Sequence, residues 1–451
     1  MEFLSFIKQA ANVKPNERQL RILRETPFYA FVHFSPNTFT DLEWGLGDED
    51  PAIFNPTKLD CEQWAKAIKD AGMKGMVLTA KHHDGFCLWQ SKYTEHCMKN
   101  SPYKNGKGDI VAEAAAACKK YGLKFGFYLS PWDRNSKYYG TDEYNTYYKN
   151  QLTELLTNYG EIFHVWFDGA CGEGPNGKKQ IYDFDGFFDL IHTLQPNASI
   201  FQDGGEMRWC GNEAGQPSYA QWAVVPSEIS KFCEVQTDPG PLATGNSLDY
   251  MFNWDTNVGE MSNIVYSKGL VFSPAETDMS IRPGWFYHKN EEPHSLERLF
   301  NTYLNTVGGN TTFNLNVPPT PEGLFDERDV QRLHELGEKI RNEFSVDLAK
   351  DAQIEEIRKE NTNLCDFVIK FPEKRKFKYL ELAEKIAEGQ RVESFIIYAK
   401  NSDGIMERKC QHNTIGSRKI VMFDEPFETD EINVKIVSAR DTVLIEWIKA
   451  Y

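Results

Sequence analysis

The sequence predicts an α/β protein in which a (β/α)8-like, TIM-type barrel is followed by a C-terminal β-sandwich. The chain has 451 residues, more than one hydrophobic core usually organises. Short β-rich runs alternate with amphipathic helical patterns over most of the first 345 residues, whereas alternating apolar and polar residues dominate afterwards. We therefore expect a barrel domain over residues 1–345 and a sandwich domain over residues 346–451.

The expected elements of the barrel follow one another in βα order. Asp60 has the position of a helix N-cap and Gly72 that of a helix stop. The segment 204–280 is less periodic and rich in Gly, Pro, Asn and Trp, so we expect long loops over shorter strands there. The predicted strands cover 28–34, 76–80, 124–129, 163–167, 198–201 and 312–317, and the predicted helices cover 60–71, 110–121, 143–159, 184–194, 295–307 and 326–344.

Two further patterns support this architecture. Residues 394–399 and 431–437 alternate between apolar and polar side chains, as strands of a sandwich do. No GxGxxG motif follows a predicted strand, which disfavours an open nucleotide-binding sheet and favours the barrel.

The composition narrows the class of function. The chain carries 50 Lys+Arg against 66 Asp+Glu, a net charge of −16, which disfavours nucleic acid and anionic membrane surfaces as partners. Nine cysteines without CxxC pairs indicate reduced thiols. No run approaches the length of a membrane span, and the first residues lack a basic stretch followed by a long apolar one. We expect a cytoplasmic location on the printed sequence, and a secreted or periplasmic one if a signal peptide has been trimmed.

Polar residues lie where the predicted strands end. Active sites of this fold form at the C-terminal ends of the barrel strands. The residues in question are His33, His82, His83, Tyr128 and Asp168.

Asp168 follows the apolar run 165–167 and precedes two small residues. A carboxylate in this place is a nucleophile or the cap of the next helix. The Gly- and Pro-containing segment 172–177 separates Asp168 from any helix, which favours the functional interpretation.

If Asp168 serves in cleavage of a glycosidic bond, a second carboxylate is needed, about 5–5.5 Å from the first when the anomeric configuration is retained. Glu213 in the segment 208–215 is our candidate for the acid/base. Sequence spacing leaves it in competition with Asp203, Glu206 and Glu173.

His33, His82 and Asp84 admit the alternative of a metal site. Adjacent histidines in an extended segment point to opposite sides, however, and neutral imidazoles also bind sugar hydroxyls without a metal. Glu43 beside Trp44, and Trp285 on a rigid turn, fit the polar and aromatic lining of a sugar pocket. We therefore expect no metal and no cofactor.

Six stretches of the chain carry a family resemblance, namely 30–34, 40–45, 79–86, 128–133, 165–170 and 280–286. They resemble the α-L-fucosidases of glycoside hydrolase family 29. The resemblance implies that Asp168 is the nucleophile and that His33, Glu43, Trp44, His82, His83, Tyr128 and Trp285 line the fucose pocket. Ser35 departs from the family pattern, in which glycine is common.

Residues 209–215 resemble the subgroup that prefers α-1,3/1,4-fucosides of Lewis type, which implies Glu213 as acid/base. The expected activity is retaining, exo-acting hydrolysis of terminal L-fucose from branched oligosaccharides. The alternatives are a broad-specificity α-L-fucosidase, a metal-dependent hydrolase and a sugar-binding protein without catalysis. The expected partner is a fucosylated oligosaccharide or glycoconjugate glycan.

Overall fold

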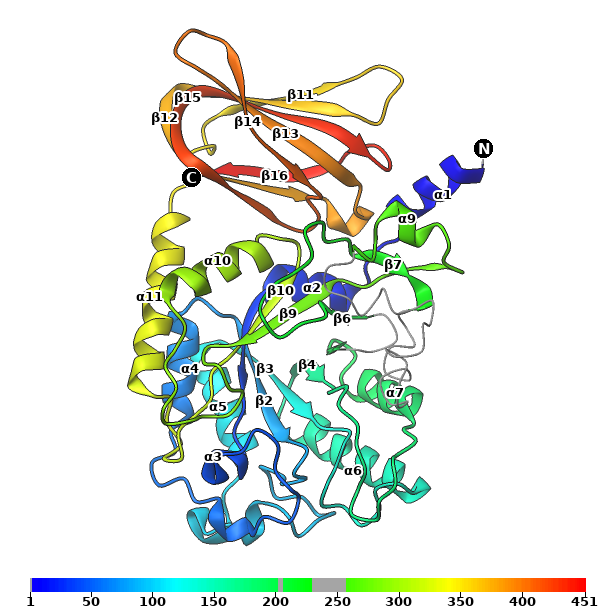
Figure 1. Cartoon of the computed structure of the whole chain (residues 1–451), viewed down its shortest axis with the longest axis vertical. Helices are drawn as coiled ribbons and strands as arrows, with labels where there is room; N and C mark the ends of the chain where they lie inside the picture. The colour runs from blue at the N-terminus through cyan, green and yellow to red at the C-terminus, as the bar shows by residue number, and fades with distance from the viewer. Residues whose placement is uncertain (1, 202–205, 229–256) are drawn as a thin grey trace.

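The computed structural model describes residues 2–201, 206–228 and 257–451. Its larger part is a nearly closed barrel of eight parallel strands (Figure 1). Neighbouring strands pair in the order β5-β4-β3-β2-β1-β10-β9-β6, and a parallel bridge between Phe201 and Met207 links the two ends of the sheet. The strands are β1 Phe28–Val32, β2 Gly75–Lys81, β3 Lys124–Leu129, β4 Ile162–Trp166, β5 Ser199–Phe201, β6 Arg208–Trp209, β9 Ala275–Ser280 and β10 Thr312–Asn316.

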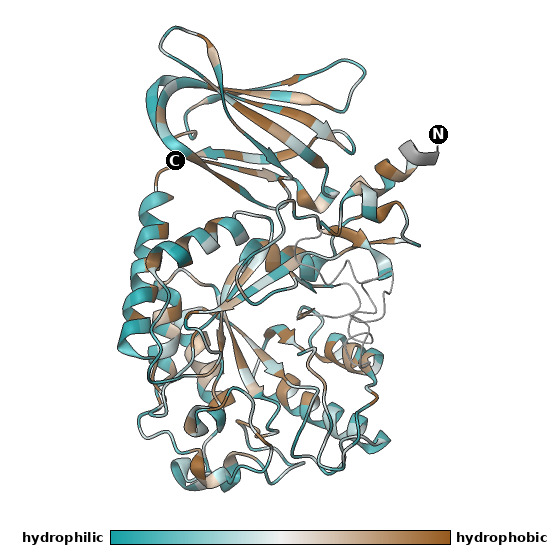
Figure 2. Cartoon of the chain, in the orientation of Figure 1, coloured by the Kyte–Doolittle hydropathy of each residue, from teal (hydrophilic) through white to brown (hydrophobic). Residues whose placement is uncertain are grey.

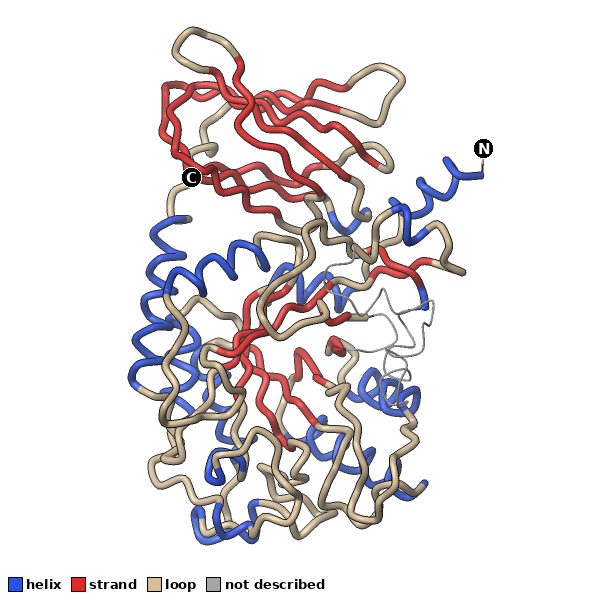
Figure 3. The backbone as a smooth tube through the Cα atoms, viewed as in Figure 1, coloured by secondary structure: helices blue, strands red, loops and turns tan. Residues whose placement is uncertain are grey.

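Helices surround this barrel (Figure 3). Among the described helices, none combines the length and the apolar composition that a membrane crossing requires. The α-helices are α1 Glu2–Ala11, α2 Glu17–Glu25, α3 Asn37–Thr40, α4 Cys61–Asp70, α5 Ile110–Tyr121, α6 Asp142–Asn158, α7 Phe184–Leu194, α9 Met261–Ile264, α10 Leu296–Thr306 and α11 Glu327–Glu343. Short 3-10 helices cover Pro51–Ile53, Met98–Asn100, Tyr103–Gly106 and Ile386–Glu388, and a small antiparallel pair joins β7 Val224–Pro226 to β8 Leu270–Phe272.

The predicted helices form because their ends carry the residues that helix termini require. The side chain of Asp60 accepts from two backbone N–H groups at the start of α4, and that of Asp109 accepts from one at the start of α5. Gly122 ends α5 in the left-handed conformation, at φ 70°. Mostly apolar strands then pack inside the ring of helices (Figure 2). These features confirm the predicted barrel.

The segment predicted as loops over shorter strands contains a full barrel strand, β9, which is buried along its whole length. Its sequence, AETDMS, lacks the apolar pattern of a strand because it places charged residues inside the barrel. Glu276 accepts hydrogen bonds there from Tyr29, from Trp166 Nε1 at 2.8 Å and from Asn314 Nδ2 at 3.1 Å, so its burial is compensated. Helices α1 and α2 were also not predicted.

The last part of the chain forms one six-stranded antiparallel sheet that bends into two layers. Register shifts between Lys370 and Arg375, and between Phe377 and Tyr379, divide β12, so its first half pairs with β11 and its second half with β16. The two layers enclose their own apolar core, which confirms the predicted sandwich. The strands are β11 Gln353–Arg358, β12 Cys365–Glu384, β13 Val392–Lys400, β14 Met406–Asn413, β15 Lys419–Ala439 and β16 Ile445–Ala450. The domain boundary at 345/346 stays a prediction.

The C-terminal sheet packs against the N-terminal ends of the barrel strands. Ile420 N donates to Gly308 O at 2.8 Å, and Asn310 N donates to Arg418 O at 3.0 Å, just before β10 begins. The loops that follow β1 and β2 therefore lie at the opposite end of the barrel (Figure 1).

Candidate active site

The site lies at the C-terminal ends of the strands, where the loops after β1, β2, β3, β4, β6 and β9 meet. Asp168, two residues beyond β4, is anchored by two hydrogen-bond donors. Tyr128 O–H donates to its Oδ2 at 3.1 Å, the backbone N–H of Ala170 donates to its Oδ1 at 2.7 Å, and His83 Nε2 lies 3.6 Å from Oδ2. Burial, followed by the charge of Asp168, raises the pKa of Tyr128 far above its usual value, so Tyr128 keeps its proton and donates.

The hydrogen-bond network assigns the tautomer of His83. Ser130 Oγ donates to Trp132 O at 2.6 Å, so it accepts from His83 Nδ1 at 2.7 Å. This leaves Nε2 of His83 as an acceptor beside Asp168. Burial lowers the pKa of His83, so the neutral ring can accept a hydrogen bond from a ligand hydroxyl.

His33 is fixed by Asn316 in a similar way. The amide nitrogen of Asn316 donates to Ser280 Oγ at 2.9 Å and to Trp285 O at 2.8 Å, so its Oδ1 faces His33 and accepts from Nδ1 at 2.8 Å. Burial lowers the pKa of His33 to about 3. The neutral His33 therefore offers Nε2 as a second acceptor.

His82 completes the group of three imidazoles. Its ring stacks on Tyr128 with centroids 5.6 Å apart, and its Nδ1 lies 3.5 Å from Asn37 Nδ2. Burial lowers the pKa of His82 well below its usual value. Asp84 instead accepts from Ser35 Oγ at 3.0 Å and from a backbone N–H in its own loop. Among the residues that the structure describes, no three His, Cys, Asp or Glu side chains are arranged to hold a metal ion.

Glu213 lies in a tight loop after β6. The loop is shaped by Asn212, whose Oδ1 accepts from Ala214 N at 3.0 Å, and by Gly215 at φ 71°, where a side chain would collide with Thr302. Trp285 Nε1 donates to Glu213 Oε2 at 3.0 Å. Withdrawal of the carboxyl from water raises the pKa of Glu213, and the negative charges of Asp168 and Glu43 raise it further.

Trp285 joins Glu213 to the rest of the site. Its ring lies against His33 with centroids 5.1 Å apart, and its backbone N–H donates to Glu43 Oε2 at 2.9 Å. The other carboxylate oxygen of Glu43 accepts from Phe286 N at 3.2 Å and lies 2.6 Å from His288 Nε2. In the structure Glu43 thus binds the Trp285 loop. A contact between Glu43 and the ligand stays a prediction.

Trp44 forms the exposed wall of the site. Its ring meets His83 and Trp132 edge to face at 5.4 and 5.6 Å, while 54% of its surface remains exposed. The buried pair Lys81 and Asp133, 3.0 Å apart, ties the end of β2 to the loop after β3. An aromatic surface this open suits the apolar face of a sugar.

The rival carboxylates for the acid/base role have different surroundings. Glu206 is buried against Arg18 and lies 3.4 Å from His192, so its contacts are structural. Glu173 is exposed, and its carbonyl accepts from Trp132 Nε1. Asp203 lies outside the described residues. Of the three described candidates, only Glu213 contacts another predicted site residue through its carboxylate.

Sequence reasoning missed four residues that shape the site, namely Asn316, Ser130, Trp132 and His288. Asn316 and Ser130 also lie at strand ends, which is the signal that could have found them. Nothing in the sequence connects His288 with Glu43, which is 245 positions away.

The comparisons with known proteins decide the family. A family model described as Alpha-L-fucosidase matches residues 33–343. The chain belongs to this family. It is therefore a glycoside hydrolase that acts on fucosylated glycans, as the resemblance in its sequence predicted.

Individual relatives agree with this fucosidase over most of its length. Alpha-L-fucosidase 1 of Arabidopsis thaliana is 40% identical over 449 residues, which cover 93% of this chain and 84% of the relative. A glycoside hydrolase 29 family member from an unknown rumen bacterium is 38% identical with a TM-score of 0.84, covering 98% and 78% of the two chains. A Ruminococcus gnavus GH29 fucosidase in complex with fucose is 30% identical with a TM-score of 0.83, covering 98% and 95%.

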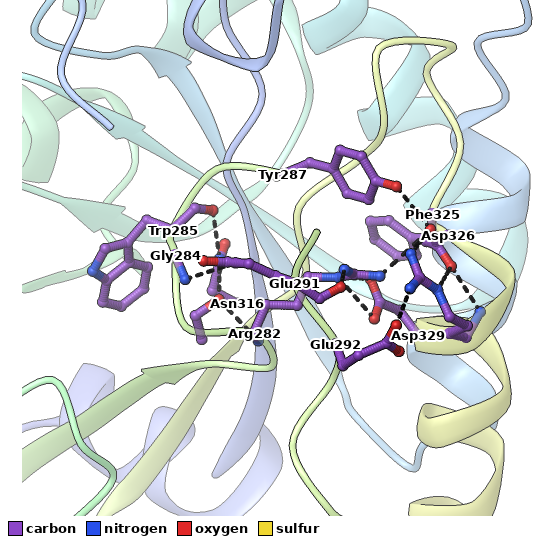
Figure 4. Close-up of polar contacts among 12 residues, drawn as sticks. Arg282, Gly284, Trp285, Tyr287, Glu291, Glu292, Asn316, Phe325, Asp326 and Asp329 are labelled. Atoms are coloured by element: carbon purple, nitrogen blue, oxygen red, sulfur yellow. Dashed lines mark hydrogen bonds and ion pairs between the residues drawn. The ribbon is translucent and has the colours of Figure 1, made fainter. Parts of the chain in front are cut away.

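The loop that carries Trp285 in the fucosidase is anchored on its far side by a buried ion pair (Figure 4). Arg282 Nε lies 2.8 Å from Asp329 Oδ2, and neither side chain reaches solvent. Arg282 also donates to Glu291 O, and Gly284 N donates to Glu291 Oε2 at 3.0 Å. The pair with Asp329 fixes the loop to helix α11, and the contacts with Glu291 hold the loop together internally.

Replacing Asp329 by alanine is expected to lower the free energy of unfolding by about 3 kcal/mol, because the Arg282 charge would stay buried without its main partner. Urea denaturation of the full chain measures this loss. Glu338→Ala on the exposed face of α11 is the control, with an expected change within about 0.5 kcal/mol. A loss for Asp329→Ala no larger than that of the control would contradict the anchoring role.

Proposed function

We propose that this fucosidase is a retaining, exo-acting enzyme that removes terminal α-1,3/1,4-linked L-fucose from Lewis-type branched oligosaccharides. Asp168 is the nucleophile and Glu213 the acid/base. His33, His82, His83, Tyr128, Trp44, Glu43 and Trp285 form the fucose pocket.

One observation carries the proposal. A continuous set of ring contacts joins the two carboxylates: Tyr128, which donates to Asp168, faces His33 at 6.1 Å, His33 faces Trp285 at 5.1 Å, and Trp285 donates to Glu213. Tyr128, His33 and Trp285 thus connect Asp168 with Glu213, and the charge of Asp168 is close enough to help raise the pKa of Glu213. Two carboxylates across one sugar are what double displacement needs.

The surroundings of the two carboxylates suit different roles. Asp168 receives donors on both oxygens, which stabilise its negative charge for attack on the anomeric carbon. Glu213 has a raised pKa, which keeps more of it protonated for donation to the leaving oxygen. These different surroundings support Asp168 as the nucleophile and Glu213 as the acid.

The reaction then has two steps. In the first, Asp168 forms a bond to the anomeric carbon while the bond to the leaving oxygen breaks and Glu213 gives that oxygen its proton. In the second, Glu213 takes a proton from a water molecule, the water oxygen attacks the anomeric carbon, and Asp168 leaves. Each step inverts the anomeric centre, so the product keeps the configuration of the substrate.

The neutral histidines supply recognition of the sugar. His33 and His83 present acceptor nitrogens to the pocket, and hydroxyl groups of fucose can donate to them. Trp44 and Trp285 offer aromatic faces for the apolar side of the ring and for the 6-methyl group. Recognition of a single sugar ring by these side chains suits a terminal residue and thus exo action.

The linkage preference is tested by comparing three substrates: an aryl α-L-fucoside, a 2′-fucosylated galactoside and a Lewis-type trisaccharide. The proposal expects the highest kcat/KM on the trisaccharide. Equal or better hydrolysis of the 2′-fucosylated compound would favour a broad-specificity enzyme instead. Proton NMR of the first product should show the α-anomer, and an initial β-anomer would exclude retention.

The pH dependence follows from the protonation that Glu213 needs. Because the acid must carry a proton, kcat/KM on an oligosaccharide should fall as pH rises through the pKa of Glu213, which lies above the ordinary 4.5. Glu213→Gln should abolish this alkaline limb along with most activity. A limb that persists unchanged in the variant would assign it to another group.

A further inference from the structure

His288 lies between two carboxylates at the rim of the site. Its Nδ1 is 2.6 Å from Asp41 Oδ1, and its Nε2 is 2.6 Å from Glu43 Oε1. A neutral imidazole has one donor and one acceptor, whereas a carboxylate can only accept. Both contacts can therefore be hydrogen bonds only when the ring is an imidazolium.

The electrostatic surroundings favour this charged form. Partial burial lowers the pKa of His288, but the hydrogen bonds to Asp41 and Glu43 and the charges of Glu43 and Glu291 outweigh it, so the pKa is raised above 6.5. Asp41 and Glu43 come from the loop after α3, and Glu291 comes from the same loop as His288.

A short chain of contacts connects His288 with Glu213. Oε1 of Glu43 accepts hydrogen bonds from His288 and from the backbone N–H of Phe286. Oε2 of Glu43 accepts from the backbone N–H of Trp285 at 2.9 Å. The indole N–H of Trp285 then donates to Glu213 at 3.0 Å. Three hydrogen bonds thus lead from the imidazolium to the acid/base.

The two sides of the Trp285 loop are held by different elements. Asp329 of α11 holds one side through Arg282, and Glu291 braces that side from within the loop (Figure 4). On the side that faces the site, Glu43 accepts from two successive backbone N–H groups, and His288 reaches back to Glu43. His288 therefore balances the charge of the carboxylate on which this second attachment depends.

We propose that His288, as an imidazolium, is a positioning residue that keeps Glu43 on the Trp285 backbone and thereby holds the Trp285 indole on Glu213. The inference rests on the proposed acid/base role of Glu213. Without the imidazolium, the Glu43 side chain can rotate toward solvent, and the Trp285 indole then shifts. Glu213 is no longer positioned to protonate the leaving oxygen. A displacement of about 1 Å can cost on the order of 10²-fold in rate.

The leaving group provides the test. Departure of 2,4-dinitrophenolate needs no protonation, whereas a sugar alkoxide needs the proton of Glu213. For His288→Ala we expect kcat/KM on a fucosylated oligosaccharide to fall on the order of 10–10²-fold further than kcat/KM on a 2,4-dinitrophenyl fucoside. Displacement of Glu43 and Trp285, which both belong to the proposed fucose pocket, weakens fucose binding on the two substrates alike and cancels in this ratio. Equal losses on both substrates, or none on either, would overturn the proposal.

Matched variants keep the outcome unambiguous. His294 lies near the end of the same segment, and its ring contacts Arg298. His294→Ala should leave kcat/KM on both substrates unchanged. Asp41→Asn removes one partner of the imidazolium without touching the ring. Asp41→Asn should show a smaller selective loss of kcat/KM on the oligosaccharide. It serves as the test if His288→Ala fails to fold.

Glu213→Ala separates failure of this inference from failure of the proposed function. If Glu213→Ala shows the selective loss and both His288→Ala and Asp41→Asn do not, only the role of His288 is wrong. If Glu213→Ala itself lacks the selective loss, the proposed acid/base is wrong. NMR titration of the His288 ring in the full chain should give a pKa above 6.5 that falls in Asp41→Asn, and a value below 6.5 would contradict the imidazolium.

Discussion

Replacing Asp168 by glycine is expected to lower kcat/KM for an aryl α-L-fucoside on the order of 10⁴-fold or more, because the group that attacks the anomeric carbon is lost. The surrounding donors, Tyr128 O–H and Ala170 N–H, would stay in place and could bind water instead. Hydrolysis of the aryl fucoside in the purified variant measures the loss.

The Asp168→Gly variant also allows a chemical check of this role. Azide can enter the space left by the carboxylate and should yield the β-fucosyl azide, the inverted product, since only one displacement occurs. Asp168→Asn, which keeps the shape of the side chain, should be equally inactive and should unfold at nearly the wild-type temperature. Near-normal turnover by either variant would contradict the assignment of Asp168.

Glu213→Ala should lower kcat/KM for a fucosylated oligosaccharide by about 10²–10⁴-fold, the usual contribution of a general acid. Because the variant keeps its nucleophile, azide can intercept the fucosyl-enzyme and should yield the α-fucosyl azide. Thin-layer chromatography and NMR of the product distinguish the two anomers. Opposite anomers from the two variants would identify each carboxylate independently.

Glu173→Ala provides the matched control, because Glu173 is exposed in a loop of the same end of the barrel. Its activity on the oligosaccharide should stay within about 2-fold of wild type, as surface changes away from a site usually do. Unaltered activity of Glu213→Ala on the oligosaccharide would remove Glu213 from the mechanism.

The sequence predicted the elements whose signals are local. The helix Ile110–Tyr121 has its cap at Asp109 and its stop at Gly122 within one stretch of chain, and the strand Lys124–Leu129 follows directly. Strand β9 could not be found in this way, because its Glu276 and Asp278 are acceptable inside the barrel only through partners on other strands. Tertiary context overrode the local pattern.

The same distinction explains the prediction of the site. His33, His82, His83, Tyr128 and Asp168 could be placed together because strand ends converge in this fold. Glu213 depended on the family resemblance, since its loop has no periodicity that fixes its direction. The link from Glu43 to His288 is a contact through space between distant loops, and a single sequence contains no signal for it.

The placement of the C-terminal sheet against the strand beginnings has a consequence for large substrates. Because the contacts at Gly308 and Asn310 lie at the opposite pole from Asp168, no part of that module needs to swing aside when a bulky glycoconjugate arrives. The loops around Trp44 can also vary in sequence without disturbing the seam at Gly308 and Asn310.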